Sequence, residues 1–319
     1  MRETMKAENI KIILVSCMSM LCCSAAFAAD ADLKSVRVCS YNIRYVGGDR
    51  GTDNDWDKRR DDVIAFVNEF DLDAFGMQEV DPEQMQYFKE KMPGYGFVGE
   101  HRNPDRKTSE ASPVAYRKER FELEKANTFW LSETPEVPGS ISKSWRAACR
   151  RVCTYAVLKD KRTGKHFCFV NTHLDGGSAK ATENGMRLIL ERMKEFIADM
   201  PVVFSGDHNC VETSNAAKMA ASILKDAFYA SEKPPEGLWR TGGGFSGKKE
   251  EISCAEALKR PKSERNSNEW RKKFGGRIDY IYVSQGVRVL DYKTDARKRP
   301  GLELQPSDHL PLLVTLVLP

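Results

Sequence analysis

Apolar residues follow two spacings along the chain, and these spacings predict the strands and helices. Residues 56–70 place apolar side chains on one helical stripe, and a longer amphipathic helix spans residues 186–197, ahead of Pro201. Another helix is expected to begin at Asp81-Pro82-Glu83, where a proline in the first turn loses no hydrogen bond. Short apolar or alternating runs predict strands at residues 36–41, 72–77, 111–117, 152–159, 166–172, 201–205, 277–283 and 310–318.

The order of these strands and helices limits the possible fold classes. Strand follows strand between residues 111 and 172, whereas helices separate the strands elsewhere, so the chain is not a clean βαβ repeat. Two sheets packed face to face with helices outside fit both parts of the pattern. The pattern alone establishes only an α/β protein.

Polar residues recur at the ends of the predicted strands. Such side chains are costly to bury unless they are paired or bound to a metal, so their repetition suggests that they converge on one site. Four carboxylates brought together would repel one another at neutral pH and would need a cation, protons or both. Oxygen ligands favour Mg²⁺ or Mn²⁺. The series is Asn42, Glu79, His173, Asp207, Asn209, Asp279, Asp308 and His309.

Six short segments around these residues together resemble the endonuclease/exonuclease/phosphatase family. One tripeptide is weak support in a chain of this length, but the ordered set covers residues 34 to 318. The resemblance implies a four-layer α/β sandwich, with two mostly antiparallel mixed sheets face to face, helices outside, and the site at one end of the sheets. The segments are Tyr41-Asn42-Ile43-Arg44, Gln78-Glu79, Asn171-Thr172-His173-Leu174-Asp175, Ser205-Gly206-Asp207-His208-Asn209, Arg277-Ile278-Asp279-Tyr280-Ile281 and Ser307-Asp308-His309.

The resemblance also implies a set of metal-site residues. Glu79 is expected to bind the metal directly, and Asn42 to lie beside it, where its amide can hold a metal water or a phosphate oxygen. Asp308 is a further metal-site carboxylate, and Asp207 and Asn209 belong to the same set. The number of metals is left open.

Hydrolysis of a phosphoester requires charge neutralisation on the phosphoryl oxygens, deprotonation of a water and stabilisation of the leaving alkoxide. By resemblance, the metal and His173 serve the first need. The proton acceptor is either His309, paired with Asp279, or Asp207, held by Asn209. The sequence leaves both alternatives open.

Two further residues are predicted to bind substrate beside Asn42 and His173. Arg151 precedes a Thr-aromatic pair at a position where similar bacterial sequences also have Arg, although a surface ion pair is an equal alternative. Phe245 lies in the glycine-rich stretch 241–247 and could stack on a base or sugar. His208 is expected in the core without a catalytic role. The highly charged residues 248–273 are predicted to be a specificity loop or a disordered excursion.

Charge gives a weak indication of the substrate. The chain has a formal net charge of +4, of which a leader with three basic and two acidic residues contributes one unit. Cations flank the predicted site in sequence and favour a polyanion such as nucleic acid, although such runs are often solvated surfaces. They are Arg150, Arg151, Lys248, Lys249, Arg271, Lys272, Lys273, Arg297, Lys298 and Arg299.

The sequence therefore predicts a Mg²⁺- or Mn²⁺-dependent phosphoester hydrolase, with a phosphodiesterase of nuclease type as the first hypothesis. The alternative enzyme acts on small phosphorylated metabolites or phospholipid headgroups, and no hydrophobic hairpin favours a membrane substrate. A catalytically silent binding protein is the third hypothesis, and the complete set of metal and proton-transfer residues argues against it. The substrate is a phosphoester, and no stable protein partner is implied.

The N-terminus resembles a secretory leader. Lys11 precedes an apolar run from Ile12 to Cys23, and Ala26-Phe27-Ala28 offers the small residues that a signal peptidase reads. Cleavage after Ala28 would leave residues 29–319 as a single domain, exported to the periplasm or the medium. The run is short for a membrane span, so membrane association is expected only if Cys22 or Cys23 is lipidated.

Cysteine usage allows a disulfide without requiring one. Three of the nine cysteines lie in the leader. Cys149 and Cys153 enclose a loop short enough for a bridge, whereas Cys39 and Cys168, on apolar strands, are expected to be buried small residues. No cysteine spacing resembles a zinc site.

Overall fold

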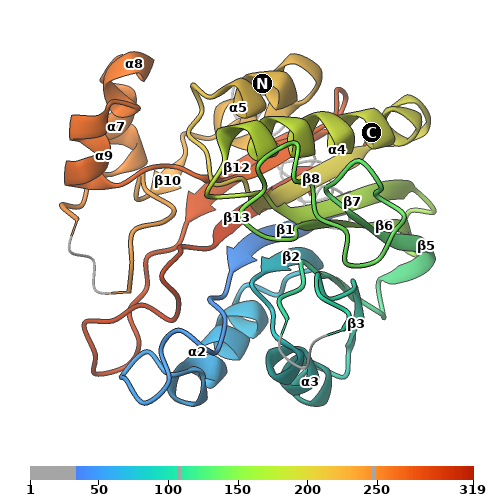
Figure 1. Ribbon diagram of the computed structural model, residues 1–319, viewed down its shortest axis with the longest axis horizontal. Helices are drawn as coiled ribbons and strands as arrows, with labels where there is room; N and C mark the ends of the chain where they lie inside the picture. The colour runs from blue at the N-terminus through green and yellow to red at the C-terminus, as the bar shows by residue number, and fades with distance from the viewer. Residues whose placement is uncertain (1–33, 106–108, 246–248) are drawn as a thin grey trace, which may run out of the picture. The chain divides into compact units, whose positions relative to one another are not determined.

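Seven strands form the first of two sheets in the compact unit Val36–Pro319 (Figure 1). This computed structural model describes residues 34–105, 109–245 and 249–319. The strands are β1 (Ser35–Asn42), β2 (Ala74–Gln78), β3 (Tyr95–Val98), β4 (Val114–Arg117), β10 (Glu236–Gly237), β12 (Arg288–Thr294) and β13 (Leu312–Val317). Their order is β10-β12-β13-β1-β2-β4-β3, with parallel pairs β1–β2 and β10–β12.

The second sheet has six strands in the described residues. They are β5 (Phe121–Trp130), β6 (Val152–Asp160), β7 (His166–His173), β8 (Val202–Asp207), β9 (Lys225–Asp226) and β11 (Asp279–Val283). Their order is β5-β6-β7-β8-β11-β9, and only β7 and β8 run parallel. Both sheets are therefore mixed and mostly antiparallel, as predicted.

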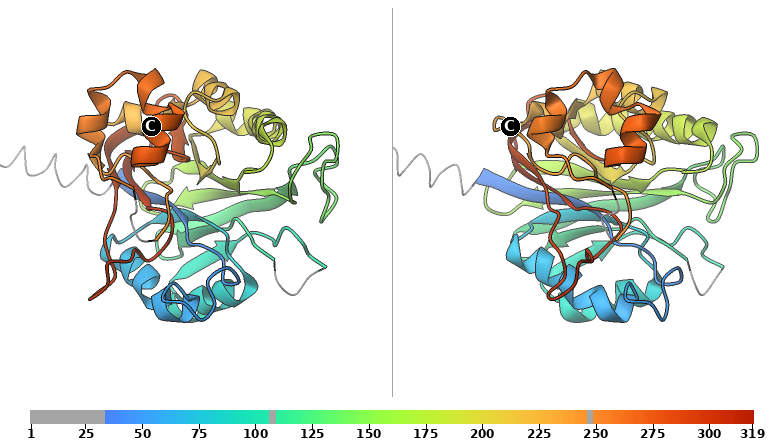
Figure 2. Two further views of the ribbon diagram at one scale, coloured as in Figure 1. Left: turned by 60° about the vertical axis from the view of Figure 1, so that its left-hand side comes forward. Right: turned by 90° about the vertical axis from the view of Figure 1, so that its left-hand side faces the viewer.

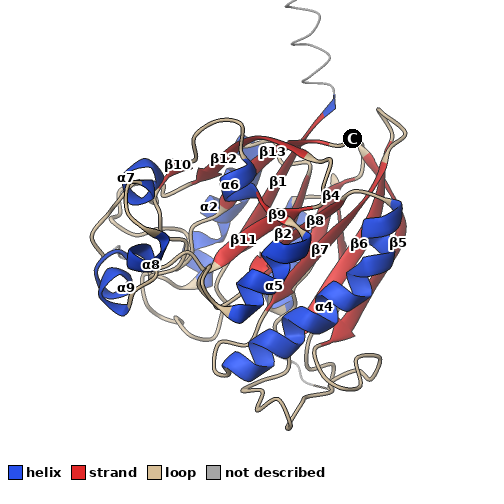
Figure 3. Ribbon diagram, turned by 90° about the horizontal axis from the view of Figure 1, so that it is seen from above, coloured by secondary structure: helices blue, strands red, loops and turns tan. Residues whose placement is uncertain are grey.

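Two pairs of helices cover the outer faces of the sheets. Helices α2 (Trp56–Glu69) and α3 (Pro82–Lys91) pack on the seven-stranded sheet, whereas α4 (Ala179–Asp199) and α5 (Asn215–Ile223) pack on the other. Figure 2 shows the two pairs on opposite sides, and Figure 3 shows α4 and α5 lying over the six-stranded sheet. A third apolar cluster fills the space between the sheets. This arrangement confirms the four-layer sandwich.

The long amphipathic helix shows how the local sequence sets an element. Ser178 caps α4 by accepting a hydrogen bond from the Ala181 backbone N–H, and Met186, Ile189 and Met193 form its buried stripe. The predicted start at Asp81 is also found, because Asp81 and Gln84 form a capping box at α3. Strands β3, β5, β9, β10 and β12 and the short helices were not individually predicted.

A buried amide connects the sheets just below the predicted site. Asn171 on β7 donates to the carbonyls of Met77 at 2.7 Å and Pro113 at 2.8 Å. Its Oδ1 accepts from Gln78 Nε2 at 2.7 Å and from Ser205 Oγ at 3.1 Å. These bonds satisfy polar groups in the core and fix the ends of β2, β7 and β8 relative to one another.

The charged segment predicted after residue 247 is folded over residues 249–274. It forms helices α7 (Cys254–Leu258), α8 (Lys262–Arg265) and α9 (Asn268–Phe274). Cys254 and Trp270 are buried in the cluster between the sheets. The alternative of a disordered excursion is therefore wrong for the described part, whereas Lys248 lies outside the described residues.

A buried polar network around Glu212 attaches this segment to the strand ends through Asn266 and Arg265. Arg277, immediately before β11, contacts Asp226 Oδ2 at 2.6 Å and Glu212 Oε2 at 3.4 Å. Glu212 also accepts hydrogen bonds from Asn266 at 2.8 Å and from Tyr229, which belongs to helix α6 (Ala227–Ala230). Because Glu212 follows β8 in sequence, the network spans both strands that present acidic residues to the site.

The cysteines differ in part from the expectation. Cys39 and Cys168 are fully buried, as predicted, and all six cysteines of the described ranges are free. The Cys149–Cys153 bridge is not formed, because Cys153 lies in the core on β6 whereas Cys149 lies outside the strand, beside Arg102. Cys17, Cys22 and Cys23 lie outside the described residues.

The N-terminal predictions also concern residues outside the described ranges. The leader over residues 1–28 and the single domain over 29–319 remain predictions. Among the residues from 34 onwards that the structure describes, none of the helices is long and apolar enough to cross a membrane.

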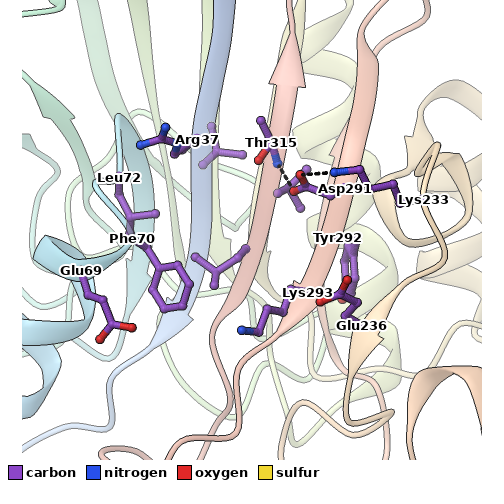
Figure 4. A pocket seen from close by; sticks show the side chains of 13 residues that line it. Arg37, Glu69, Phe70, Leu72, Lys233, Glu236, Asp291, Tyr292, Lys293 and Thr315 are labelled. Atoms are coloured by element: carbon purple, nitrogen blue, oxygen red, sulfur yellow. Dashed lines mark hydrogen bonds and ion pairs between the residues drawn. The ribbon is translucent and has the colours of Figure 1, made fainter. Parts of the chain in front are cut away.

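A groove of about 410 Å³ lies over the middle of β1, β12 and β13, on the outer face of the seven-stranded sheet. Phe70 and Leu72 line one side (Figure 4). On the other side Asp291 accepts from the Thr315 backbone at 3.2 Å and pairs with Lys233 at 3.9 Å. The groove contains none of the predicted site residues.

A substitution at Gly76 tests how closely the two sheets approach each other. A Cβ at this position would lie 2.4 Å from Ser205 Oγ and 2.5 Å from Asn171 Oδ1. Gly76→Ala should therefore lower the free energy of unfolding by about 1–3 kcal/mol through overpacking. Gly94→Ala is the control, because its Cβ would meet nothing within 4 Å. Equal denaturant midpoints for the two variants would contradict the inter-sheet packing.

Glu212 should stabilise the fold in a pH-dependent way. Burial raises its pKa, but Arg277, Tyr229 and Asn266 outweigh burial, so the pKa lies below the ordinary 4.5. A carboxyl group whose pKa is lower in the folded than in the unfolded protein stabilises the fold at pH values above its unfolded pKa. This stabilisation is lost as the pH falls through the folded pKa. Glu212→Gln should therefore cost about 3 kcal/mol at pH 7. When denaturant unfolding is measured at a series of pH values, the loss in free energy of unfolding caused by the substitution should shrink below pH 4.5.

The matched control for this prediction is Glu232→Gln, which removes an exposed ion pair with Arg288. Exposed pairs contribute about 0–1 kcal/mol, so the control should change little at either pH. A Glu212→Gln loss that stayed constant between pH 7 and pH 3 would contradict the role of the carboxylate.

Candidate active site

Strand register places the predicted residues of the two sheets at one end. Asn42 and Gln78 are paired at the ends of β1 and β2, and Glu79 follows. In the other sheet Asp207 is paired with His173 on one side and with Asp279 on the other. Each strand therefore ends with a polar side chain at the same edge.

Asn42 connects the acidic groups of the two sheets. Its Nδ2 donates to Glu79 Oε1 at 3.1 Å and to Asp207 Oδ2 at 3.0 Å. The Asn42 side chain is fully buried, and its backbone carbonyl accepts from Ser307 Oγ at 2.7 Å. Asn42 thus bridges two carboxylates with its side-chain amide and holds the Ser307-Asp308-His309 loop beside β1 with its backbone carbonyl.

His309 lies between two buried aspartates. Its Nδ1 donates to Asp279 Oδ2 at 2.9 Å, and its Nε2 lies 3.7 Å from Asp207 Oδ2. Asp207, Asp279 and His309 offer ligand atoms within 4.8 Å of one another, so these three residues could hold a metal ion. Asp308 lies on the Arg44 side, with its Oδ2 at 3.6 Å from the guanidinium.

His173 and Asn209 form the other side of the cluster. Asn209 Nδ2 donates to His173 Nε2 at 2.9 Å, and its backbone N–H donates to Asp207 Oδ1 at 2.9 Å. Because Nε2 accepts, the ring proton is on Nδ1. That Nδ1 is buried and has no hydrogen-bond partner in the described ranges, so His173 is not a satisfied core histidine.

Backbone strain is concentrated at the site. Arg44, Glu79 and Asn209 have φ angles of 61°, 63° and 49°. Residues other than glycine rarely adopt this left-handed backbone conformation. Those that do cluster where function requires a fixed side-chain direction. At Glu79 the reversal directs the carboxylate back towards Asn42.

Burial and charge shift the pKa values of the cluster in opposite directions. Burial, with Asp279 nearby, raises the pKa of Asp207 to about 7. Burial also raises the pKa of Asp308. Burial lowers the pKa of His309, but Asp279 and Asp207 outweigh it and hold that pKa well above its usual range. Burial, with Arg151 nearby, holds the pKa of His173 well below its usual range.

These shifts show that burial, together with neighbouring carboxylates, disfavours a negative charge on two groups of the cluster. Two carboxyl groups retain protons more strongly than usual, and Asp279 Oδ1 is buried without a partner in the part of the chain that the structure describes. Carboxylate and amide oxygens are the ligands of hard divalent cations. The donor set therefore fits a divalent metal ion.

Comparison with known proteins agrees with this geometry. Residues 39–309 match the sequence model of the Endonuclease/Exonuclease/phosphatase family. The chain belongs to this family. The enzyme class that the motifs predicted, a phosphoester hydrolase, is the class of the family.

Two solved structures have the same fold, each with a TM-score of 0.74, and the first is described as an endonuclease/exonuclease/phosphatase. The protein from Bacteroides vulgatus is 31% identical, over 89% of this chain and 99% of that chain. A mannosyl-6-phosphatase from Bacteroides thetaiotaomicron is 30% identical, over 88% and 99%. Uncharacterized protein L388 of Acanthamoeba polyphaga mimivirus is 25% identical over 48% of this chain, and the chain spans 59% of its length.

The two predicted substrate contacts differ in their placement. Arg151 lines a small pocket with Glu79 and His173, and its Nη1 lies 3.9 Å from Glu110 Oε2, so its role in substrate binding stays a prediction. Phe245 is only 8% exposed, with the Arg59 guanidinium 5.5 Å from its ring centroid. Its ring is therefore packed in the protein and is not presented for stacking.

The loop before Phe245 nevertheless supports the site. Thr241 Oγ1 accepts from the backbone N–H groups of Ile278 and Asp279, each at 3.0 Å. Gly242 forms a β-bridge with His309. The glycine-rich stretch thus positions Asp279 through the Thr241 hydroxyl and His309 through a backbone bridge. His208 is buried in stacked contact with Tyr280 and Tyr282, as predicted.

Several residues of the site were not predicted as such. Arg59 on α2 is fully buried and donates to the carbonyls of Ile43, Arg44 at 2.7 Å and Pro306 at 3.2 Å. It therefore joins the segments on both sides of the metal-site candidates. The signal was present in the sequence, because Arg59 falls on the apolar stripe of its helix. Arg44, Arg102 and Glu110 gave no comparable signal.

Proposed function

We propose that the chain is a Mg²⁺-dependent hydrolase of phosphate esters whose substrate is a small phosphorylated molecule. The supporting observation is the single cluster in which Asn42 joins Glu79 to Asp207, with the His309–Asp279 pair in contact with the same Asp207 carboxylate. A binding protein has no need for this combination of acids, amide and imidazole.

The metal would be held by the oxygen donors at the strand ends. Glu79, Asn42 and Asp308 form one side of the donor set, and Asp207 and Asn209 form the other. Bound Mg²⁺, or Mn²⁺ in its place, would supply positive charge to the phosphoryl oxygens and the leaving alkoxide. Whether one or two ions bind stays open.

The pKa shifts suggest how the proton-transfer roles are divided. His309, whose pKa is held well above its usual range, is a cation at neutral pH and donates a hydrogen bond to the phosphoryl group. Asp207 is positioned by Asn209 and Asn42 and accepts the proton of the attacking water. Of the two bases that the sequence leaves open, this proposal selects Asp207, with Asp279 orienting His309.

His173 serves a separate purpose in this proposal. Its pKa lies well below the usual range, so the ring is neutral at physiological pH. Asn209 holds Nε2 as an acceptor, which leaves the Nδ1 proton available. We assign that proton to a hydrogen bond with a phosphoryl oxygen.

Two observations favour a small substrate over a polynucleotide. A groove of about 410 Å³, lined by Tyr45, Arg102 and Glu110, adjoins the site and has the size of a small-molecule pocket. The solved relative at 30% identity is described as a mannosyl-6-phosphatase. A phosphorylated sugar is therefore the first substrate class to test.

The cations that suggested nucleic acid are largely engaged within the protein. Arg297 pairs with Glu69 and Asp295, and Arg299 is buried against Asp62. Lys273 pairs with Glu250. The nuclease-type phosphodiesterase stays a hypothesis, with Arg271 and Lys272 as exposed cations that could contact a polyanion.

Export is proposed on the sequence alone. The apolar run ahead of Ala26-Phe27-Ala28 is typical of a secretory leader, and the enzyme would then act in the periplasm or the medium. A lipoprotein attached through Cys22 or Cys23 is the alternative, and labelling with a radioactive fatty acid distinguishes the two.

Metal removal and two substitutions test the activity. Protein with Mg²⁺ should hydrolyse hexose 6-phosphates, and excess EDTA should abolish phosphate release until Mg²⁺ is restored. Glu79→Gln and His309→Ala should lower kcat by about 10²–10⁴-fold, because each removes a charge that acts on the reacting phosphate. Phosphate release and thermal melting are measured on the same preparations.

His166→Ala is the matched control for His309→Ala, because His166 is exposed on β7 and pairs with Glu124. It should retain full turnover. Activity that survives EDTA, or His309→Ala protein with normal kcat, would refute the proposal. Hydrolysis of single-stranded DNA faster than of sugar phosphates would replace the small substrate with the nuclease hypothesis.

A further inference from the structure

Two arginines flank the site next to Glu79 and His173. Arg151 precedes β6, and Arg102 lies in the loop ahead of β4. Both line a small pocket with Glu79 and His173, and Glu110 lies between them. The adjoining groove of about 410 Å³ also includes Arg102 and Glu110. Arg102 therefore stands where the reaction centre opens into the groove.

One carboxylate holds both guanidinium groups. Glu110 Oε1 pairs with Arg102 Nη2, and Oε2 lies 3.9 Å from Arg151 Nη1. The side chains of Glu110 and Arg102 are each 17% exposed, and that of Arg151 is 12% exposed. The two guanidinium groups and the Glu110 carboxylate share a mostly dehydrated setting, and the Glu79 carboxylate lines the same pocket.

Several donors of the two arginines have no strong acceptor. The Nε atoms of Arg102 and Arg151 are buried without a hydrogen-bond partner among the described residues. Arg102 Nη1 meets only the thiol of Cys149, at 3.7 Å. Arg120 differs in that two carboxylates meet its guanidinium group, Asp73 at 2.7 Å and Asp160 at 3.0 Å. Unpaired buried donors are costly, so an anionic ligand would complete them.

The backbone fixes Arg102 before any ligand binds. Its N–H donates to the Glu110 carbonyl at 2.9 Å, and its carbonyl accepts from Trp130 Nε1 at 2.9 Å. A β-bridge between His101 and Ala111 closes the loop on either side. A preorganised guanidinium loses little freedom when it binds and matches the two oxygens of a phosphate or carboxylate.

We propose that Arg102 and Arg151, spaced by Glu110, form a second anion-binding subsite beside the reaction centre. This inference rests on the proposed function, since it concerns the part of the substrate next to the scissile phosphate. Preferred substrates then have a second phosphate or a carboxylate within a few bonds of the ester. The shared chemistry is a planar or tetrahedral oxyanion that accepts two parallel N–H bonds.

A matched series of substrates tests the subsite. The three esters are 3-hydroxypropyl phosphate, propane-1,3-diol bisphosphate and 3-carboxypropyl phosphate, which differ only in the distal group. Wild-type protein should favour at least one anionic ester over the neutral one by about tenfold or more in kcat/KM, as charged hydrogen bonds allow. Preference for the bisphosphate or for the carboxylate identifies which anion the subsite takes.

Arg102→Gln should remove most of that preference by raising KM for the anionic ester, with kcat less affected. Arg288→Gln removes an exposed arginine that pairs with Glu232 and is the control, in which the preference should persist. Equal kcat/KM for all three esters in the wild type, or a uniform loss in Arg102→Gln, would overturn the subsite, because a structural arginine would affect every substrate alike.

A binding measurement separates this inference from the proposed function. Calorimetry with His309→Ala protein and Mg²⁺ compares the same three esters without turnover, and then repeats the comparison with Arg102→Gln added. Tighter binding of an anionic ester that depends on Arg102 supports the subsite even if none of the three is hydrolysed. Equal affinities for all three esters would overturn it even if hydrolysis is observed.

Discussion

Mutual repulsion between carboxylates brought together from two different sheets is the constraint around which the site is built. Glu79 follows a strand of one sheet and is half-buried, Asp207 and Asp279 are buried on the other, and the fold brings them to one edge. The Asn42 amide relieves part of this repulsion by donating to two carboxylates, and His309 relieves part by lying between two aspartates. Burial, together with the repulsion from Asp279 that remains, raises the pKa of Asp207 to about 7 and favours a cation.

The framework that maintains this unfavourable cluster is polar as well as apolar. Asn171 fixes the register of the two sheets below the site, and Arg277 with Glu212 joins the segments next to β8 and β11. Arg59 joins the segments on either side of the metal-site candidates. Each is a buried, hydrogen-bonded group whose partners lie in other segments. Such networks resist relaxation, so the acidic side chains cannot move apart to lower their energy.

The sequence predicted the strands that end in polar residues, because burial at period two and a change to polar character mark them clearly. It also predicted the family and the convergence of the eight residues. It did not predict the burial of Phe245 or the folding of residues 249–274, because both depend on contacts between distant segments, and it did not predict the pairing of Arg102 with Glu110. Trp270 packs in the core between the sheets, and Arg102 meets Glu110 across a loop. Local patterns do not encode such pairings.

The central claim is that the acidic cluster takes up a divalent cation in exchange for protons. Isothermal titration of the metal-free protein with Mg²⁺ in buffers of different ionisation enthalpy tests it most directly. Because the pKa of Asp207 is raised to about 7, binding at pH 7 should release protons, and the release should fade at higher pH. Glu79→Gln should weaken the binding. Mg²⁺ that binds without proton release at pH 7, or does not bind at all, would contradict the account.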